Sequence, residues 1–159
     1  MIQPQDVIVH HIDLIFNISS APFLKNLDHT YSRKTGKIKS FGARGALYGT
    51  FRSDGGIALT IAGAVALMPA SKFYRNYVTP MPEVIQFIKE SKSLFCKHVL
   101  FVGSNICVGS EAIIVDQKDN ILAVGKSLTT SFWLNSNQSR GIAVRIREGL
   151  KGRETNELI

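Results

Sequence analysis

The chain has 159 residues, of which 45% are hydrophobic and 19% are charged, a composition typical of folded globular proteins that excludes extensive disorder. Its longest apolar run, residues 57–68, is shorter than the roughly 18 residues that a membrane-spanning helix needs, so we expect no membrane partner. A formal charge of +7 favours polyanionic partners, with RNA ahead of anionic lipid.

The N-terminal segment predicts a helix rather than a leader. Ile8, Ile12, Ile15 and Phe16 follow the spacing of an amphipathic helix, although Val7 and Val9 leave a strand open. Residues 1–11 contain no Lys or Arg, so the segment does not fit a secretory signal. We therefore expect a cytoplasmic protein, or a nucleolar one if its source is eukaryotic.

The next segment is basic and rich in turns. Residues 33–52 contain six Lys or Arg and no Asp or Glu, with glycines interspersed. Residues 48–51 and 57–68 flank Asp54-Gly55-Gly56, a turn signal between two apolar runs, which predicts a β-hairpin.

The pattern changes in the second half. Pro82 suits a helix start, and Val84, Phe87, Ile88 and Phe95 would form the apolar face of that helix. Short apolar runs follow at residues 98–102, 112–115, 121–124 and 142–146, which predict the strands of a small barrel. We therefore expect an α+β fold, with an N-terminal α/β domain carrying an antiparallel sheet at residues 1–94 and a β pseudo-barrel at residues 95–159.

The chain shows no pattern typical of catalysis. Neither a phosphate-binding glycine loop nor a nucleophile elbow is present, and the acidic residues are scattered. Cys96, His98 and the distant Cys107 do not have the spacing of a zinc site. We expect no metal, no cofactor and no enzymatic activity.

The last predicted strand carries the most informative pattern. Arg145 and Arg147 alternate with Ile142, Val144 and Ile146, which would put both arginines on one outward face, about 7 Å apart. That spacing suits successive phosphates of single-stranded RNA, although an ordinary solvated strand face explains it too. Because both arginines point outward, their replacement by alanine should spare the fold. The candidate RNA-binding residues are Arg140, Arg145, Arg147, Lys151 and Arg153.

Several motifs in the last 65 residues resemble a PUA domain, a small RNA-binding pseudo-barrel. They include Leu122-Ala123-Val124-Gly125 and Gly141-Ile142-Ala143-Val144. With the upstream motifs Ser40-Phe41-Gly42, Tyr48-Gly49-Thr50-Phe51 and Leu67-Met68-Pro69, the chain resembles the NIP-seven family of large-ribosomal-subunit biogenesis factors.

This resemblance implies a non-enzymatic factor that binds pre-ribosomal RNA in large-subunit assembly and rRNA processing. Its partners would be the pre-ribosomal particle or exosome proteins, and its RNA surface would fall on Arg145, Arg147, Lys151 and Arg153. Three other functions stay open: an adaptor that guides an RNA-modifying or RNA-degrading complex, a translation-associated RNA-binding protein, and a structural protein of the ribosome.

Overall fold

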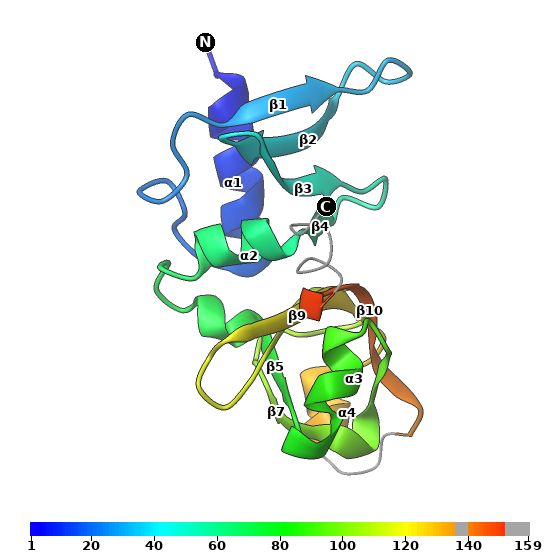
Figure 1. The fold of residues 1–159 in the computed structure, drawn as a ribbon. Helices are drawn as coiled ribbons and strands as arrows, with labels where there is room; N and C mark the ends of the chain where they lie inside the picture. Colours follow the sequence, from blue (N-terminus) through cyan, green and yellow to red (C-terminus); the bar gives the residue numbers. More distant parts are fainter. Residues whose placement is uncertain (136–139, 152–159) are drawn as a thin grey trace. The chain divides into compact units, whose positions relative to one another are not determined.

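The computed structural model describes residues 1–135 and 140–151, and the chain forms two compact units, Met1–Phe73 and Tyr74–Ile159 (Figure 1). The elements of the first unit are α1 (Pro4–Phe16), β1 (Asp28–Tyr31), β2 (Ile38–Ala43), β3 (Ala46–Phe51), β4 (Ile57–Leu59) and α2 (Ile61–Leu67). In the described part of the chain, no helix is long and apolar enough to cross a membrane.

The predicted N-terminal helix is confirmed, and the strand alternative is excluded. Pro4 occupies the first turn, where its missing amide costs nothing, and the Asp6 carboxylate accepts a 3.2 Å hydrogen bond from the Gln3 amide. The helix ends at Phe16, and the next residue, Asn17, caps it with the left-handed φ of 54°. Its buried face consists of Ile8, Val9, Ile12 and Phe16.

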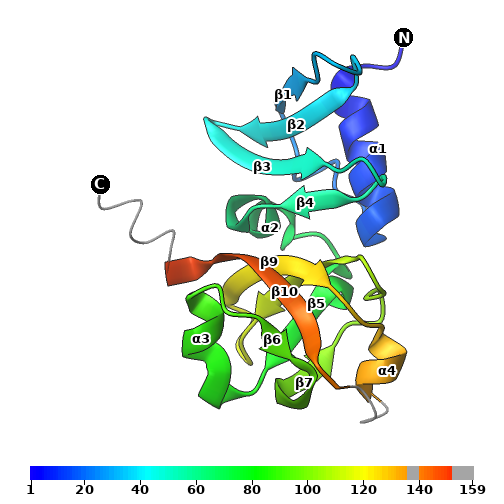
Figure 2. The same ribbon diagram turned by 90° about the vertical axis from the view of Figure 1, so that its right-hand side faces the viewer.

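The four strands of the first unit form an antiparallel sheet in the order β1-β2-β3-β4, and α1 lies on one face of it (Figure 2). The predicted hairpin is confirmed, because Phe51 pairs with Ile57 across the turn. The apolar run after the turn, however, is a strand only as far as Leu59. Thr60 then caps α2, since its hydroxyl accepts a 3.0 Å hydrogen bond from the Gly63 amide.

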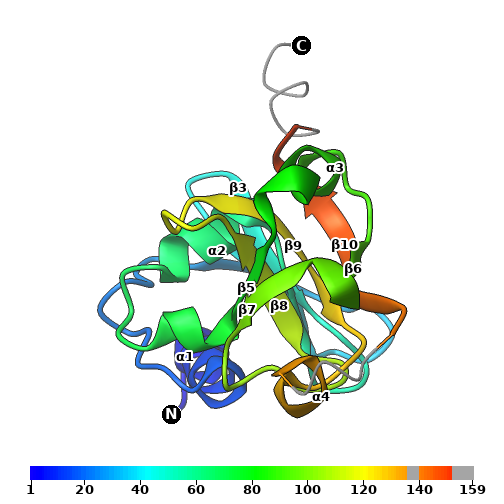
Figure 3. The same ribbon diagram turned by 90° about the horizontal axis from the view of Figure 1, so that it is seen from below.

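The second unit is a strongly curled sheet in the order β6-β10-β9-β8-β5-β7, with β5 and β8 parallel and the other pairs antiparallel (Figure 3). The short helix η3 (Cys96–His98) connects the two edge strands, β6 and β7, and the sheet curls into a half-barrel. The predicted α+β class and pseudo-barrel are therefore confirmed. The other elements are η1 (Phe73–Asn76), β5 (Tyr77–Pro80), η2 (Pro82–Val84), α3 (Ile85–Lys89), β6 (Leu94–Phe95), β7 (Val99–Val102), β8 (Glu111–Val115), β9 (Ile121–Ser127), α4 (Ser131–Asn135) and β10 (Ile142–Gly149).

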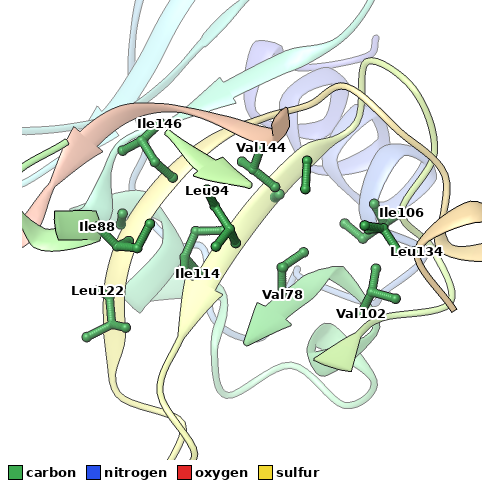
Figure 4. Close-up of a cluster of buried hydrophobic side chains, with 13 residues drawn as sticks. Val78, Ile88, Leu94, Val102, Ile106, Ile114, Leu122, Leu134, Val144 and Ile146 are labelled. Atoms are coloured by element: carbon green, nitrogen blue, oxygen red, sulfur yellow. The ribbon is translucent and has the colours of Figure 1, made fainter. Parts of the chain in front are cut away.

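One apolar cluster fills the half-barrel (Figure 4). All six strands of the sheet contribute to it, together with Ile106, Ile88 of α3 and Leu134 of α4. Burial of these side chains is the main stabilisation of the unit. Its largest members are Val78, Ile88, Leu94, Val102, Ile106, Ile114, Leu122, Leu134, Val144 and Ile146.

The two units meet earlier in the chain than the boundary at residues 94/95 that the sequence predicts. The reason is tertiary: β5 pairs with β7 and β8, and α3 packs on β9 and β10, so both belong to the second unit. The predicted face of the helix after Pro82 also differs. Ile88 is buried, whereas Phe87 and Phe95 are 56% and 44% exposed, because the helix is short and Phe95 lies in the edge strand β6.

Candidate nucleic-acid interface

Strand β10 carries the centre of the predicted RNA surface. Val144 and Ile146 are buried in the half-barrel, and Arg145 between them is exposed, as the alternation predicts. Arg145 makes no ion pair with any described residue. Its guanidinium is therefore available to an anionic ligand.

Arg147 has a different environment, which the alternation does not reveal. The register of β10 against β9 shifts between Ile146 and Glu148, so Arg147 lies at a bulge. Both terminal nitrogens of its guanidinium donate to the Glu111 carboxylate of β8, one of them at 3.0 Å to Oε1. The Glu111 side chain is fully buried, and that of Arg147 is 38% exposed.

This two-point contact gives Arg147 a structural role. A buried carboxylate without a partner is costly, and Arg147 neutralises it while satisfying both of its oxygens. The expectation that both arginines can be removed without affecting the fold is therefore wrong for Arg147, because its partner is buried 36 residues away in sequence.

A row of charged side chains crosses the sheet at this point. Arg145 of β10 lies opposite Lys126 of β9, which in turn lies opposite Glu111 of β8. Directly opposed residues share a face of a sheet, so this face carries two arginines, one lysine and one glutamate. Sequence reasoning missed Lys126, since its place beside Arg145 depends on the β9–β10 register. We call Lys126, Arg145 and Arg147 the β10 cations.

The other candidate residues do not join this group. Lys151 follows β10 and forms a 2.8 Å ion pair with Glu90, just beyond α3. The Lys151 hydrogen bond is the main cause that lowers the pKa of the Glu90 carboxyl below its usual value. Arg140 is exposed and precedes β10, five residues before Arg145, which allows a separation of up to about 17 Å. Arg153 lies outside the described residues.

The described residues show no cluster of side chains suited to a metal ion. In residues 1–135 and 140–151, no three His, Cys, Asp or Glu side chains gather where they could hold a metal ion. Cys107 is exposed, and its thiol lies 3.0 Å from the Ser110 hydroxyl. The sheet face with the β10 cations carries positive charge on a hydrogen-bonded strand, which suits phosphate binding.

Sequence comparisons connect the chain with RNA-modifying enzymes. A tRNA-guanine(15) transglycosylase from Thermococcus onnurineus is 36% identical over 121 residues, which cover 76% of this chain and 21% of the enzyme. The chain thus spans about a fifth of the length of the curated relatives it matches. None of the comparisons shows membership of the NIP-seven family.

Structural comparisons support the fold. A hypothetical protein of Pyrococcus horikoshii has a TM-score of 0.68 at 13% identity, over 96% of this chain and 93% of that one. A PUA domain from Aeropyrum pernix has a TM-score of 0.64 at 16% identity, over 94% and 84% of the two chains. The family model of the PUA domain matches residues 78–150, which include β10 and the β10 cations. The chain therefore contains a PUA domain, at residues 78–150.

Proposed function

We propose that this chain is a non-enzymatic RNA-binding protein that holds tRNA for a tRNA-modifying system. The observation that carries the proposal is the extent of the similarity to the tRNA-guanine(15) transglycosylase. It covers 121 residues, whereas the PUA model matches only residues 78–150, so the similarity extends beyond the PUA domain. An RNA-binding domain within a segment shared with a tRNA enzyme supports tRNA as the ligand.

The β10 cations give this proposal a physical basis. Arg145 is exposed and makes no ion pair with a described residue, and Lys126 lies opposite it on the neighbouring strand. Phosphate contacts of this kind supply most of the affinity of sequence-independent RNA binding. We assign phosphate binding to Arg145 and Lys126, and support of this surface to Arg147 through its contact with buried Glu111.

The proposal assigns RNA binding, and no catalytic step, to the residues of this chain. The matched segment is about a fifth of the transglycosylase, and it contains the RNA-binding PUA domain. We infer that these residues contribute RNA binding and that the chemical step of the modification is performed by residues outside the matched segment.

Ribosome assembly is the second candidate function. The motifs Ser40-Phe41-Gly42 and Tyr48-Gly49-Thr50-Phe51, which resemble the NIP-seven family, favour it. Under this alternative, the same PUA domain would bind pre-ribosomal RNA in the cytoplasm or nucleolus.

Crosslinking of the cellular protein to RNA, followed by sequencing, separates the two functions. Enrichment of tRNA supports the proposal, enrichment of immature large-subunit rRNA supports the alternative, and no enrichment of any RNA refutes both. Fluorescence anisotropy with a labelled tRNA then tests the surface. R145Q should weaken binding and flatten the plot of log affinity against log salt by about 0.7 to 0.9. K118Q, which removes an exposed charge in the β8–β9 turn, is the control and should reduce the affinity less than R145Q does.

A further inference from the structure

Within residues 1–135 and 140–151, a dense group of basic side chains without an ion pair lies outside the PUA domain. Several basic side chains are neutralised by ion pairs, among them Arg52 by Asp54, Arg147 by Glu111 and Lys151 by Glu90. By contrast, four cations within seven residues of the first unit are exposed and make no ion pair with a described residue. They are Arg33, Lys34, Lys37 and Lys39, and no acidic residue occurs between Asp28 and Asp54.

These four cations lie within residues 32–39, the turn after β1 and the first two residues of β2, which we call the β1–β2 tip. Figure 1 shows it extending past the ends of the strands that it joins. Hydrogen bonds fix its backbone: the Ser32 amide donates to the Lys37 carbonyl and the Gly36 amide to the Ser32 carbonyl, each at 2.8 Å. Gly36 adopts the left-handed φ of 70° that the turn requires.

Below the tip, the Thr30 and Ser40 hydroxyls form a 2.6 Å hydrogen bond between the two strands. The cations are thus presented by an ordered backbone, and binding would cost little further loss of backbone conformational entropy. This distinguishes the tip from a flexible basic tail.

The arrangement of the cations favours a double-stranded ligand. Arg33 and Lys34 follow β1, whereas Lys37 and Lys39 lie on the β2 side, across a strand spacing of about 4.8 Å. Lys39 is the extra residue of a bulge, since Thr30 pairs with Ser40 but the next residue, Tyr31, pairs with Ile38. The charges therefore leave the hairpin from both strands, so several of these long side chains can reach phosphates of a duplex backbone at once.

The tip is poorly suited to single-stranded RNA, which proteins bind by stacking bases on aromatic rings. Tyr31 is the aromatic residue at its base, and its ring packs edge-on against His29, with the centroids 5.2 Å apart. Duplex RNA is recognised mainly by shape and by backbone contacts, which need cations rather than aromatic platforms.

We propose that the β1–β2 tip is a second RNA contact, which binds the phosphate backbone of a double-stranded stem. The proposal rests on the proposed RNA-binding function and adds to it a site in the first unit and a ligand class. The tip would bind the stem without reading its sequence, since phosphates carry no base identity.

The test compares two variants of the full chain that lose the same number of positive charges. The tip variant is R33Q/K34Q/K37Q/K39Q, and the control replaces four exposed lysines elsewhere by Gln: Lys25, Lys72, Lys92 and Lys118. Anisotropy at several salt concentrations is measured with a perfectly paired 16-bp RNA hairpin and with an unstructured RNA of equal length. Circular dichroism establishes that both variants are folded.

We expect the tip variant to lose about tenfold to hundredfold in affinity for the hairpin, with a salt dependence flatter by about two units or more, and the control to lose less than threefold. Equal losses in the two variants would overturn the proposal, as would a loss confined to the unstructured RNA. Failure of the wild-type protein to bind any RNA would instead refute the proposed function itself.

A crosslinking measurement locates the contact independently of affinity. The photoreactive residue p-benzoylphenylalanine replaces Thr35 at the β1–β2 tip or, as control, Gln117 in the exposed β8–β9 turn. We expect hairpin RNA to crosslink to the protein substituted at Thr35 and not at Gln117. The opposite pattern, or equal yields, would contradict the assignment.

Discussion

Removal of Arg147 should destabilise the PUA domain, although a strand-alternation argument makes this residue look dispensable. In R147A the fully buried Glu111 carboxylate loses both guanidinium hydrogen bonds. Loss of one partner from a buried ion pair usually costs about 3–5 kcal/mol. Because the Arg147 side chain is 38% exposed, water can reach part of the site, so we expect a loss of about 2–4 kcal/mol.

Urea unfolding followed by circular dichroism measures this loss. With an m value of about 1.5 kcal/mol/M for a domain of this size, a loss of 3 kcal/mol lowers the midpoint by about 2 M. R145A is the matched control, since Arg145 is exposed and makes no ion pair with a described residue. Its free energy of unfolding should change by less than about 0.5 kcal/mol.

A double variant separates the buried charge from the lost packing. In E111M/R147M no charge is buried, and two apolar chains occupy the same space, so its stability should return to within about 1–1.5 kcal/mol of the wild type. The reasoning is refuted if R147A is as stable as R145A. It is also refuted if the double variant is no more stable than R147A.

Three further predictions concern the fold. G125A should cost more than about 2 kcal/mol of unfolding free energy in a denaturant titration, because its new methyl group would lie against the Arg145 carbonyl oxygen where β9 pairs with β10. A change below about 0.5 kcal/mol would contradict this close approach. T60A should cost about 0.5–2 kcal/mol, since the Gly63 amide loses its cap, whereas T60S should retain most of the stability; equal losses in thermal unfolding would argue against capping. Burial raises the pKa of the Tyr77 phenol above its usual value of 10.0, so the folded state holds this proton more tightly than the unfolded state. The resulting stability is present below pH 10 and is lost as the pH rises through the raised pKa. In denaturant titrations from pH 8 to 11.5, the free energy of unfolding should therefore fall more steeply for the wild type than for Y77F. An equal fall for the two proteins would exclude this cause.

The β10 cations and the β1–β2 tip show why charge in a sequence does not locate an RNA surface. Arg145, Arg147 and Lys151 look equivalent as basic residues near the C-terminal end. In the folded chain Arg147 and Lys151 are bound by Glu111 and Glu90, and only Arg145 is left without an ion pair among these three. The tip, by contrast, keeps all of its charges free of ion pairs with described residues.

Local sequence patterns were sufficient for several of the elements. The helical spacing of Ile8 and Ile12 predicts α1, the Asp54-Gly55-Gly56 signal predicts the β3–β4 turn, and apolar runs predict the strands of the half-barrel. These features depend on the spacing of apolar residues and on turn-forming residues within short stretches of chain, and both can be read from the sequence alone.

The element boundaries, the extent of the second unit and the role of Arg147 depend on contacts between residues that are distant in the sequence. The run at residues 57–68 divides into a strand and a helix because Leu59 pairs in the sheet while Thr60 caps α2. The second unit begins before β5 because that strand pairs with β7 and β8, and Arg147 is structural because a carboxylate 36 residues away is buried beside it. Period and propensity carry no information about which distant residue a side chain meets, so strand register and burial, and with them the availability of each cation, were determined only by the tertiary structure.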